Sequence, residues 1–264
     1  MPAREYVRRL RGTRYVSVRQ RHGRFTLAVT EIGARRAGQP AFVLVHGIGV
    51  SSRMFLPLTL RLAREGSVHL VDLPGYGFAP DPKTHVSLDD HVEVVAALVR
   101  DAGLDPVVLI GHSMGAQVVT AVGERYPDLV DRIVLIAPTI EPERRTAPRA
   151  VVSLLRDSLR EPFVVSWIAF TDYLFRCGLP YLIRQFPVLL DDALEDRIAQ
   201  VSHPMLIVHG ERDAVVSRAW CVELAERSGA RFVEVPGPHS VMYSDPEVIV
   251  AEILALVAGA EERS

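Results

Sequence analysis

The hydrophobic positions of this chain form short, β-branched runs separated by longer stretches that mix apolar and polar residues. Short apolar runs of this kind predict buried strands, whereas apolar residues at a helical spacing predict amphipathic helices. Eight runs predict strands: Tyr15 to Val18, Phe25 to Ile32, Ala41 to Val45, Val68 to Val71, Val107 to Ile110, Ile133 to Ala137, Met205 to Val208 and Phe232 to Val235.

The order of the runs indicates the fold class. The first two, joined by a segment that contains Gly23, predict an antiparallel hairpin. From the third run onward, strands alternate with helix-like stretches, which is the βαβ rhythm of a mostly parallel sheet with helices on both faces. The last helix should begin with Asp245 as its N-cap and Pro246 at its first position. The predicted helices are Leu88 to Ala102, Met114 to Arg125, Arg218 to Arg227 and Glu247 to Ala260.

One interval breaks this rhythm. Residues 140–202 have helical periodicity and no comparable strand, with a charged first part and an aromatic-rich stretch at residues 163–175. We interpret the interval as a helical cap inserted into an α/β core of residues 1–139 and 203–264. Residues 1–14 form a basic N-terminal arm in this division.

Composition and charge exclude several classes of protein. A hydrophobic fraction of 48% and a charged fraction of 23% are those of a soluble globular protein. The two cysteines, Cys177 and Cys221, give no disulfide framework or metal motif. The sequence contains no secretory signal and no apolar run of membrane-spanning length, so we expect a cytoplasmic protein without a membrane span.

The net charge of -2 hides an asymmetry, since residues 1–24 hold eight arginines against Glu5. A basic arm can contact nucleic acid or anionic lipid. We favour a solvated segment that leads into the first strand, because no aromatic or motif context accompanies the charge, and we expect no nucleic-acid partner.

The strongest chemical signal is Gly111-His112-Ser113-Met114-Gly115, directly after the predicted strand Val107 to Ile110. A serine between a strand and a helix, with glycine two residues to either side, is typical of a nucleophile elbow. The alternative is an ordinary turn of glycine and serine that joins strand to helix.

Two further segments supply partners for such a serine. A serine hydroxyl needs a general base, and the base needs an orienting acid. Asp213 follows the strand Met205 to Val208, and His239 follows the strand Phe232 to Val235. Both should lie at the carboxyl edge of the sheet, where open α/β sheets build their sites. Glu141 is the rival acid.

The chain order Ser113, Asp213, His239 is the one expected with a nucleophile elbow, and on these motifs the sequence resembles the α/β-hydrolase fold family. The resemblance implies an eight-stranded core, a serine esterase-like member with a helical cap, and the roles of nucleophile, acid and base for these residues. It also implies an oxyanion hole made by the amides of Ile48 and Met114. We expect neither a metal nor a cofactor.

The residues around the serine narrow the reaction. Relatives that use aspartate at position 113, epoxide hydrolases and haloalkane dehalogenases, are excluded, and Gly49 after Ile48 disfavours perhydrolases. Carbon-carbon bond hydrolases of ring-cleavage products share Ser113-Met114-Gly115 but usually have Asn and Trp where this chain has His112 and Ser240. We expect a carboxylic ester or thioester hydrolase, with the carbon-carbon hydrolases second and a ligand receptor or low-turnover triad protein as a third alternative.

The aromatic stretch of the cap suggests how the substrate is held. Aromatic side chains at helical spacing could line an apolar pocket over Ser113, for a small molecule with an apolar or aromatic portion, or could simply pack in the core. The oligomeric state is left open. The candidate pocket residues are Trp167, Phe170, Tyr173 and Phe175, and we expect structural roles for Asp72, His46, His112 and His209.

Overall fold

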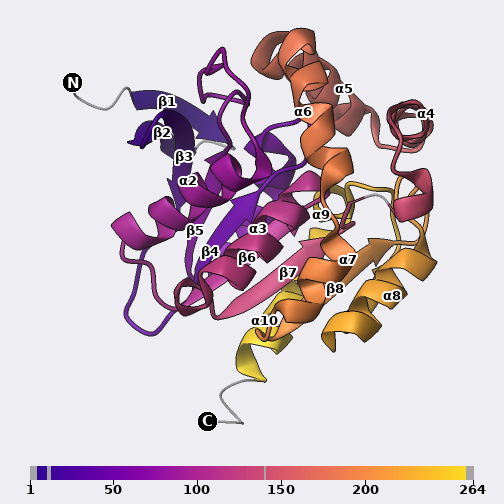
Figure 1. The fold of residues 1–264 in the computed structure, drawn as a ribbon. Helices are drawn as coiled ribbons and strands as arrows, with labels where there is room; N and C mark the ends of the chain where they lie inside the picture. The colour runs from indigo at the N-terminus through magenta and orange to yellow at the C-terminus, as the bar shows by residue number, and fades with distance from the viewer. Residues whose placement is uncertain (1–4, 11–12, 140, 260–264) are drawn as a thin grey trace.

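A nine-stranded sheet runs through the molecule, which the computed structural model describes for residues 5–10, 13–139 and 141–259 (Figure 1). All eight predicted strands are confirmed. The ninth strand, β1, lies in the predicted basic arm and pairs with β2; residues 1–4 and 11–12 of that arm lie outside the described residues. The strands are β1 Glu5–Leu10, β2 Thr13–His22, β3 Phe25–Ile32, β4 Ala41–Val45, β5 Ser67–Asp72, β6 Val107–His112, β7 Arg132–Ile136, β8 Met205–Gly210 and β9 Arg231–Val235.

The strand order is β1-β2-β3-β5-β4-β6-β7-β8-β9. Strands β1, β2 and β3 pair antiparallel, β3 pairs antiparallel with β5, and all pairs from β5 to β9 are parallel. Gly23, with a φ of 58°, makes the tight turn of the predicted hairpin. Because β4 to β9 are mutually parallel, the loops after them share one edge of the sheet.

Helices cover both faces of the sheet, as the sequence predicts. Alternate residues of the buried strands point to opposite faces: Val43 and Leu109 join one core cluster with α2 and α3, while Leu44 and Ile110 join the other with α1 and α10. The helices that cover the two faces are α1 Leu56–Leu62, α2 Leu88–Asp101, α3 Met114–Arg125, α8 Arg218–Ser228, α9 Val241–Ser244 and α10 Pro246–Ala258.

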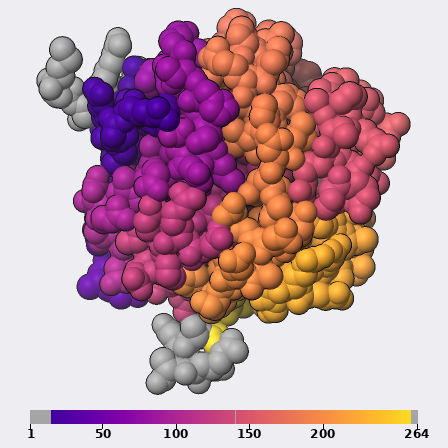
Figure 2. Space-filling model, in the orientation of Figure 1, coloured from indigo at the N-terminus to yellow at the C-terminus, as the bar shows by residue number. Residues whose placement is uncertain are grey.

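The interval between β7 and β8 forms helices and lies over one end of the sheet (Figure 1). In the space-filling view its red and orange residues form one side of the molecule (Figure 2). The proposed boundary of this cap, residues 140–202, stays a prediction. The cap helices are α4 Ala147–Ser158, α5 Phe163–Asp172 with a π-helical turn Tyr173–Cys177, α6 Leu179–Asp191 and α7 Leu194–Arg197.

Buried polar contacts fix the cap to the loops at the sheet edge. Asp172, fully buried, accepts hydrogen bonds from the Ser51 amide at 3.0 Å and the Ser51 hydroxyl at 2.7 Å, and it pairs with Arg53 at 2.5 Å. The Tyr181 hydroxyl donates to the Pro74 carbonyl at 2.5 Å. A buried carboxylate requires such partners, so these contacts specify where the cap sits.

Candidate active site

Ser113 occupies a strained turn between β6 and α3. Its φ of 53° and ψ of -119° lie in a region that residues with a side chain rarely adopt. The neighbouring glycines make the turn possible: a Cβ on Gly111 would lie 2.4 Å from the Gly115 carbonyl oxygen, and one on Gly115 would lie 2.2 Å from the Val45 oxygen. The strand, turn and helix predicted around this serine are therefore present with the close backbone contacts that require glycine.

Asp213 and His239 meet at the same edge, on the loops after β8 and β9. His239 Nδ1 donates to Asp213 Oδ2 at 2.8 Å. Asp213 Oδ1 accepts the amides of Val215 at 2.7 Å and Val216 at 3.0 Å, and its side chain is fully buried. Three hydrogen bonds thus hold the Asp213 carboxylate in place. The carboxylate in turn orients the imidazole of His239 through Nδ1, so that Nε2 makes no bond to Asp213.

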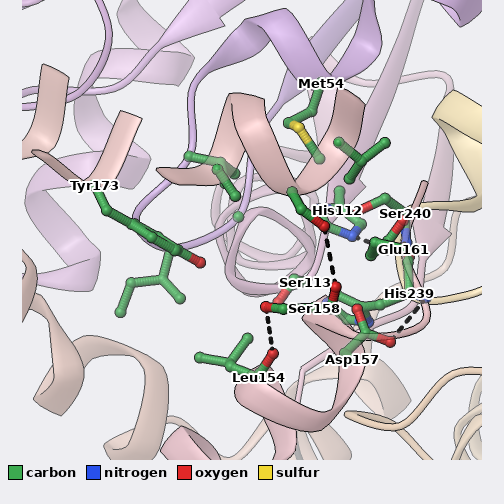
Figure 3. A pocket seen from close by; sticks show the side chains of 16 residues that line it. Met54, His112, Ser113, Leu154, Asp157, Ser158, Glu161, Tyr173, His239 and Ser240 are labelled. Carbon is green, nitrogen blue, oxygen red and sulfur yellow. Dashed lines mark hydrogen bonds between the residues drawn. The ribbon is translucent and has the colours of Figure 1, made fainter. Parts of the chain in front are cut away.

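Ser113 and His239 line one cavity beneath the cap (Figure 3). Within the described residues no hydrogen bond joins Ser113 Oγ to His239, although such contacts are often loose in unliganded enzymes. His112, the residue before the serine, packs against His239: their ring centroids are 4.7 Å apart, and a 3.3 Å contact joins His112 Nε2 to the His239 carbonyl.

Two carboxylates of the cap also surround His239. Asp157, at the end of α4, is buried and accepts the amides of His239 at 3.3 Å and Ala214 at 3.4 Å. Glu161, three residues beyond the end of α4, accepts the Ser240 amide at 2.7 Å. Sequence reasoning missed both residues. The one available signal is that Asp157 shares a helical face with Ala150 and Leu154, which predicts an inward side chain.

The negative charges favour the protonated imidazole. Burial alone would lower the pKa of His239, but the charge and hydrogen bond of Asp213, followed by the charges of Asp157 and Glu161, raise it to about 9. Burial would raise the pKa of Asp213, yet His239 and the two amides bring it below its usual value. Burial, aided by the charge of Asp157, raises the pKa of Glu161 to about 7.

The residues predicted to form an oxyanion hole both belong to this region. Met114 is the first residue of α3, so its amide has no acceptor within the helix and lies at the positive end of the helix dipole. Ile48 lines the cavity. Its loop runs close to the serine, since a Cβ on the neighbouring Gly47 would lie 3.0 Å from Ser113 Cβ. An unpaired backbone amide at a helix N-terminus is a group that can donate to a developing oxyanion, so the oxyanion hole stays a prediction for these two residues.

The cavity itself is small, about 50 Å³, which holds a few water molecules. Its wall combines apolar side chains with the carboxylates of Asp157 and Glu161, and among the described residues no arginine or lysine lines it. The lining residues are Gly47, Ile48, Val50, Met54, His112, Ser113, Leu154, Asp157, Ser158, Glu161, Val165, Ser166, Ala169, Tyr173, His239 and Ser240.

The predicted aromatic pocket needs correction. Tyr173 lines the cavity, but Trp167 and Phe170 are each about half exposed and Phe175 is more exposed still. Val165 and Ala169 of helix α5 point toward the cavity. Trp167 lies two positions from each of them, and residues two positions apart on a helix point to different sides. Trp167, Phe170 and Phe175 therefore lie on the outer surface of the cap, and Tyr173 alone of the four predicted aromatic residues lines the cavity.

The remaining polar residues near the strand ends make structural contacts. Asp72 accepts the amides of Ser52 and Phe78, both at 2.9 Å. His46 Nε2 accepts the Leu73 amide, and His209 contacts the Val216 carbonyl and Glu234. Glu141, the rival acid, accepts the Ser217 amide at 3.2 Å and pairs with Arg144 at 2.9 Å, while Asp213 holds His239.

Comparisons with known proteins agree with this geometry. A model of the Alpha/beta hydrolase family matches residues 42–252. The chain is 28% identical to the 2-(acetamidomethylene)succinate hydrolase of Mesorhizobium japonicum, over 90% of this chain and 94% of that one. It is 26% identical to a monoacylglycerol lipase of Mycolicibacterium smegmatis, over 78% and 82% respectively. The crystal structure of E-2-(acetamidomethylene)succinate hydrolase superposes with a TM-score of 0.79 at 26% identity, covering 92% of this chain and 99% of that chain.

Proposed function

Because this chain belongs to the alpha/beta hydrolase family, we propose that it is a serine hydrolase that cleaves a carboxylic ester or thioester through an acyl-enzyme on Ser113. Its relatives support a hydrolase, and they include both a succinate hydrolase and a lipase. The observation that carries the proposal is that His239, paired with Asp213 at 2.8 Å, lines the same cavity as Ser113 on its strained turn.

The proposed reaction has two halves. His239 Nε2 takes the proton of Ser113 Oγ while the oxygen attacks the substrate carbonyl. The amides of Ile48 and Met114 donate to the oxyanion, and its collapse expels an alcohol or thiol that takes the proton from His239. A water molecule, deprotonated by His239, then attacks the acyl-enzyme. Collapse of this second oxyanion breaks the bond to Ser113 Oγ, which takes the proton back from His239, and the acid is released. Throughout, the negative charge of Asp213 stabilises the imidazolium.

A carbon-carbon bond hydrolase is the second candidate, because Ser113-Met114-Gly115 is shared with that class, and a relative of similar length hydrolyses a substituted succinate. The succinate part of the substrate named for that relative carries two carboxylates, and the cavity in this chain holds Asp157 and Glu161 with no arginine or lysine among the described residues that line it. Like charges repel strongly in a buried site. This charge pattern favours a substrate that is neutral near the reacting carbonyl, as in a simple ester or thioester.

The test is a screen of the purified protein against esters and thioesters of increasing acyl length. We expect turnover of neutral esters by the wild type, no turnover by Ser113→Ala, and unchanged rates for Ser228→Ala, whose hydroxyl donates to the Leu224 carbonyl within α8 and does not line the cavity. A serine-directed phosphonate should label Ser113. Hydrolysis that survives Ser113→Ala would overturn the proposal.

Turnover number separates the enzyme from the receptor alternative. A receptor or low-turnover protein should release about one equivalent of product and then stall as the acyl form. A hydrolase should pass through many cycles. Ring-cleavage products of the carbon-carbon class, assayed beside the esters, decide between the two hydrolase candidates.

A further inference from the structure

The outer surface of the cap, within Ala147 to Ile183, is unusually apolar. Of the thirteen large hydrophobic side chains that are exposed in the described part of the chain, twelve lie in this segment and the other is Val248. Soluble monomers rarely gather so many on one element of the fold. We call these twelve the outer cap face: Val151, Val152, Leu155, Leu159, Phe163, Val164, Trp167, Phe170, Leu174, Phe175, Leu179 and Ile183.

These residues follow the helical repeat. On α4 the exposed positions 151, 152 and 155, continued by Leu159 directly after the helix, form one stripe. On α5 positions 163, 164, 167 and 170 form another. The rings of Phe163, Trp167 and Phe170 stack in sequence, with centroids 6.5 Å and 5.8 Å apart. These three rings are stacked side by side and about half exposed or more, so none of the described residues covers them fully.

The charges of the same segment are sorted by side. Arg149, Arg156 and Arg160 are exposed, whereas the carboxylates of the segment, Asp157, Glu161 and Asp172, face inward as buried or partly buried groups. No carboxylate between residues 147 and 183, all of which the structure describes, is exposed. The outer surface is therefore both apolar and positively charged.

The same two helices line the candidate active site with their inner sides. Leu154 and Ser158 of α4 and Val165 of α5 contact the cavity that holds Ser113, as Figure 3 shows for the α4 residues. The ends of the two helices are joined by the Ser166 hydroxyl, which donates to the Ser158 carbonyl at 3.0 Å. Only these two helices would thus separate a surface bound to the outer cap face from the cavity that holds Ser113.

We propose that the outer cap face docks on the surface of an anionic lipid membrane and that the hydrolase takes apolar acyl substrates from it. The inference deepens the proposed function and rests on it for the substrate, but not for the docking. Exposed tryptophan and phenylalanine beside arginine are the side chains that bind at a membrane interface and attract anionic headgroups. No helix among the described residues is long and apolar enough to cross a membrane, and surface docking requires none.

A second copy of the chain is a poorer occupant of this face. A twofold dimer would bring the same patch of both copies together, so the arginines of one copy would meet those of the other. Residues 147–183 offer no exposed carboxylate to pair with them, and Glu143, just outside this segment, shares a surface hollow with the three arginines Arg144, Arg149 and Arg156, so positive charge still predominates there. A lipid surface supplies the missing negative charge.

Co-sedimentation with vesicles tests the docking. The protein should bind vesicles of equal parts phosphatidylcholine and phosphatidylglycerol, bind phosphatidylcholine alone weakly, and dissociate from the anionic vesicles as salt is raised. Trp167→Ser should weaken binding about tenfold or more, and Arg156→Ser about fivefold on anionic vesicles only. Val248→Ser and Arg64→Ser, exposed residues outside the cap, are matched controls that should bind as the wild type does.

Fluorescence supplies a second readout, since the chain has two tryptophans and Trp220 is buried. Emission should shift to the blue on vesicle binding, and Trp167→Phe should abolish that shift while binding persists. An absence of binding to anionic vesicles overturns the proposal, and so does a dimer in sedimentation velocity that Trp167→Ser dissociates.

All binding is measured in the Ser113→Ala background as well as in the wild type, so that catalysis plays no part. If vesicle binding fails while soluble short esters are still cleaved, the docking is refuted and the proposed function stands. If the protein binds vesicles but cleaves no ester, the docking stands and the proposed function is refuted.

Discussion

The protonation of His239 sets the pH at which the proposed hydrolase works, and Glu161 provides a way to change it. Only a neutral imidazole can take the proton of Ser113. With the pKa of His239 raised to about 9, about 1% of the molecules carry a neutral His239 at pH 7. The groups that face the ring are Asp213, Asp157, Glu161 and His112, and the first three are acids that raise its pKa.

Glu161→Gln removes one of these charges and keeps an oxygen that can accept the Ser240 amide. A nearby opposite charge changes a pKa by about one unit or more, so the rising limb of kcat/KM against pH should move about one unit lower. The pKa of Glu161 is itself about 7, so below that pH its charge is largely absent in the wild type and the rate advantage of Glu161→Gln shrinks. Above pH 10 His239 is mostly neutral in both proteins, so the two rates should converge. Coupling the two titrations gives a rate about threefold higher near pH 8.

The assay is a kcat/KM profile from pH 6 to 10 with a neutral short-chain ester. Glu143→Gln, the same change at an exposed glutamate of the cap, should leave the profile unchanged. A limb that stays in place or moves to higher pH in Glu161→Gln would refute the electrostatic reasoning. A fall in rate at every pH would instead assign Glu161 a purely structural role through the Ser240 amide.

Three further substitutions test the fold and the site. Gly115→Ala should lower the free energy of unfolding by about 1 to 3 kcal/mol in urea titrations, because its Cβ would lie 2.2 Å from the Val45 oxygen; an unchanged midpoint contradicts this. Asp213→Asn should reduce kcat on the order of 10⁴-fold in steady-state assays with little change in KM, since the imidazolium loses its counter-charge, and a loss below tenfold would exclude the assigned role. Asp172→Ala should cost about 3 kcal/mol by calorimetry, because Arg53 loses its buried partner, whereas Asp191→Ala on the exposed side of α6 should cost little.

Much of the core was predictable from the sequence because its signals are local. Buried parallel strands are continuous apolar runs, and the runs alternate with helices in the order that the sheet requires. The carboxyl ends of parallel strands share an edge, so the order Ser113, Asp213, His239 at successive strand ends predicted that these residues meet. The one strand that was missed, β1, consists of Glu5–Leu10, in which charged and apolar residues mix without a clear period.

The sequence by itself thus determined the α/β architecture, the turn that carries Ser113 and the proximity of Asp213 and His239, which pair at 2.8 Å. Only the tertiary structure decided which way the cap faces. Helix α5 is apolar on nearly all sides, so its sequence has no polar stripe to mark the outside, and the aromatic residues predicted to line the pocket lie on the outer surface. The contacts of Asp157 with His239 and of Glu161 with Ser240 join residues about eighty positions apart, and such proximity follows from packing, which no local pattern encodes.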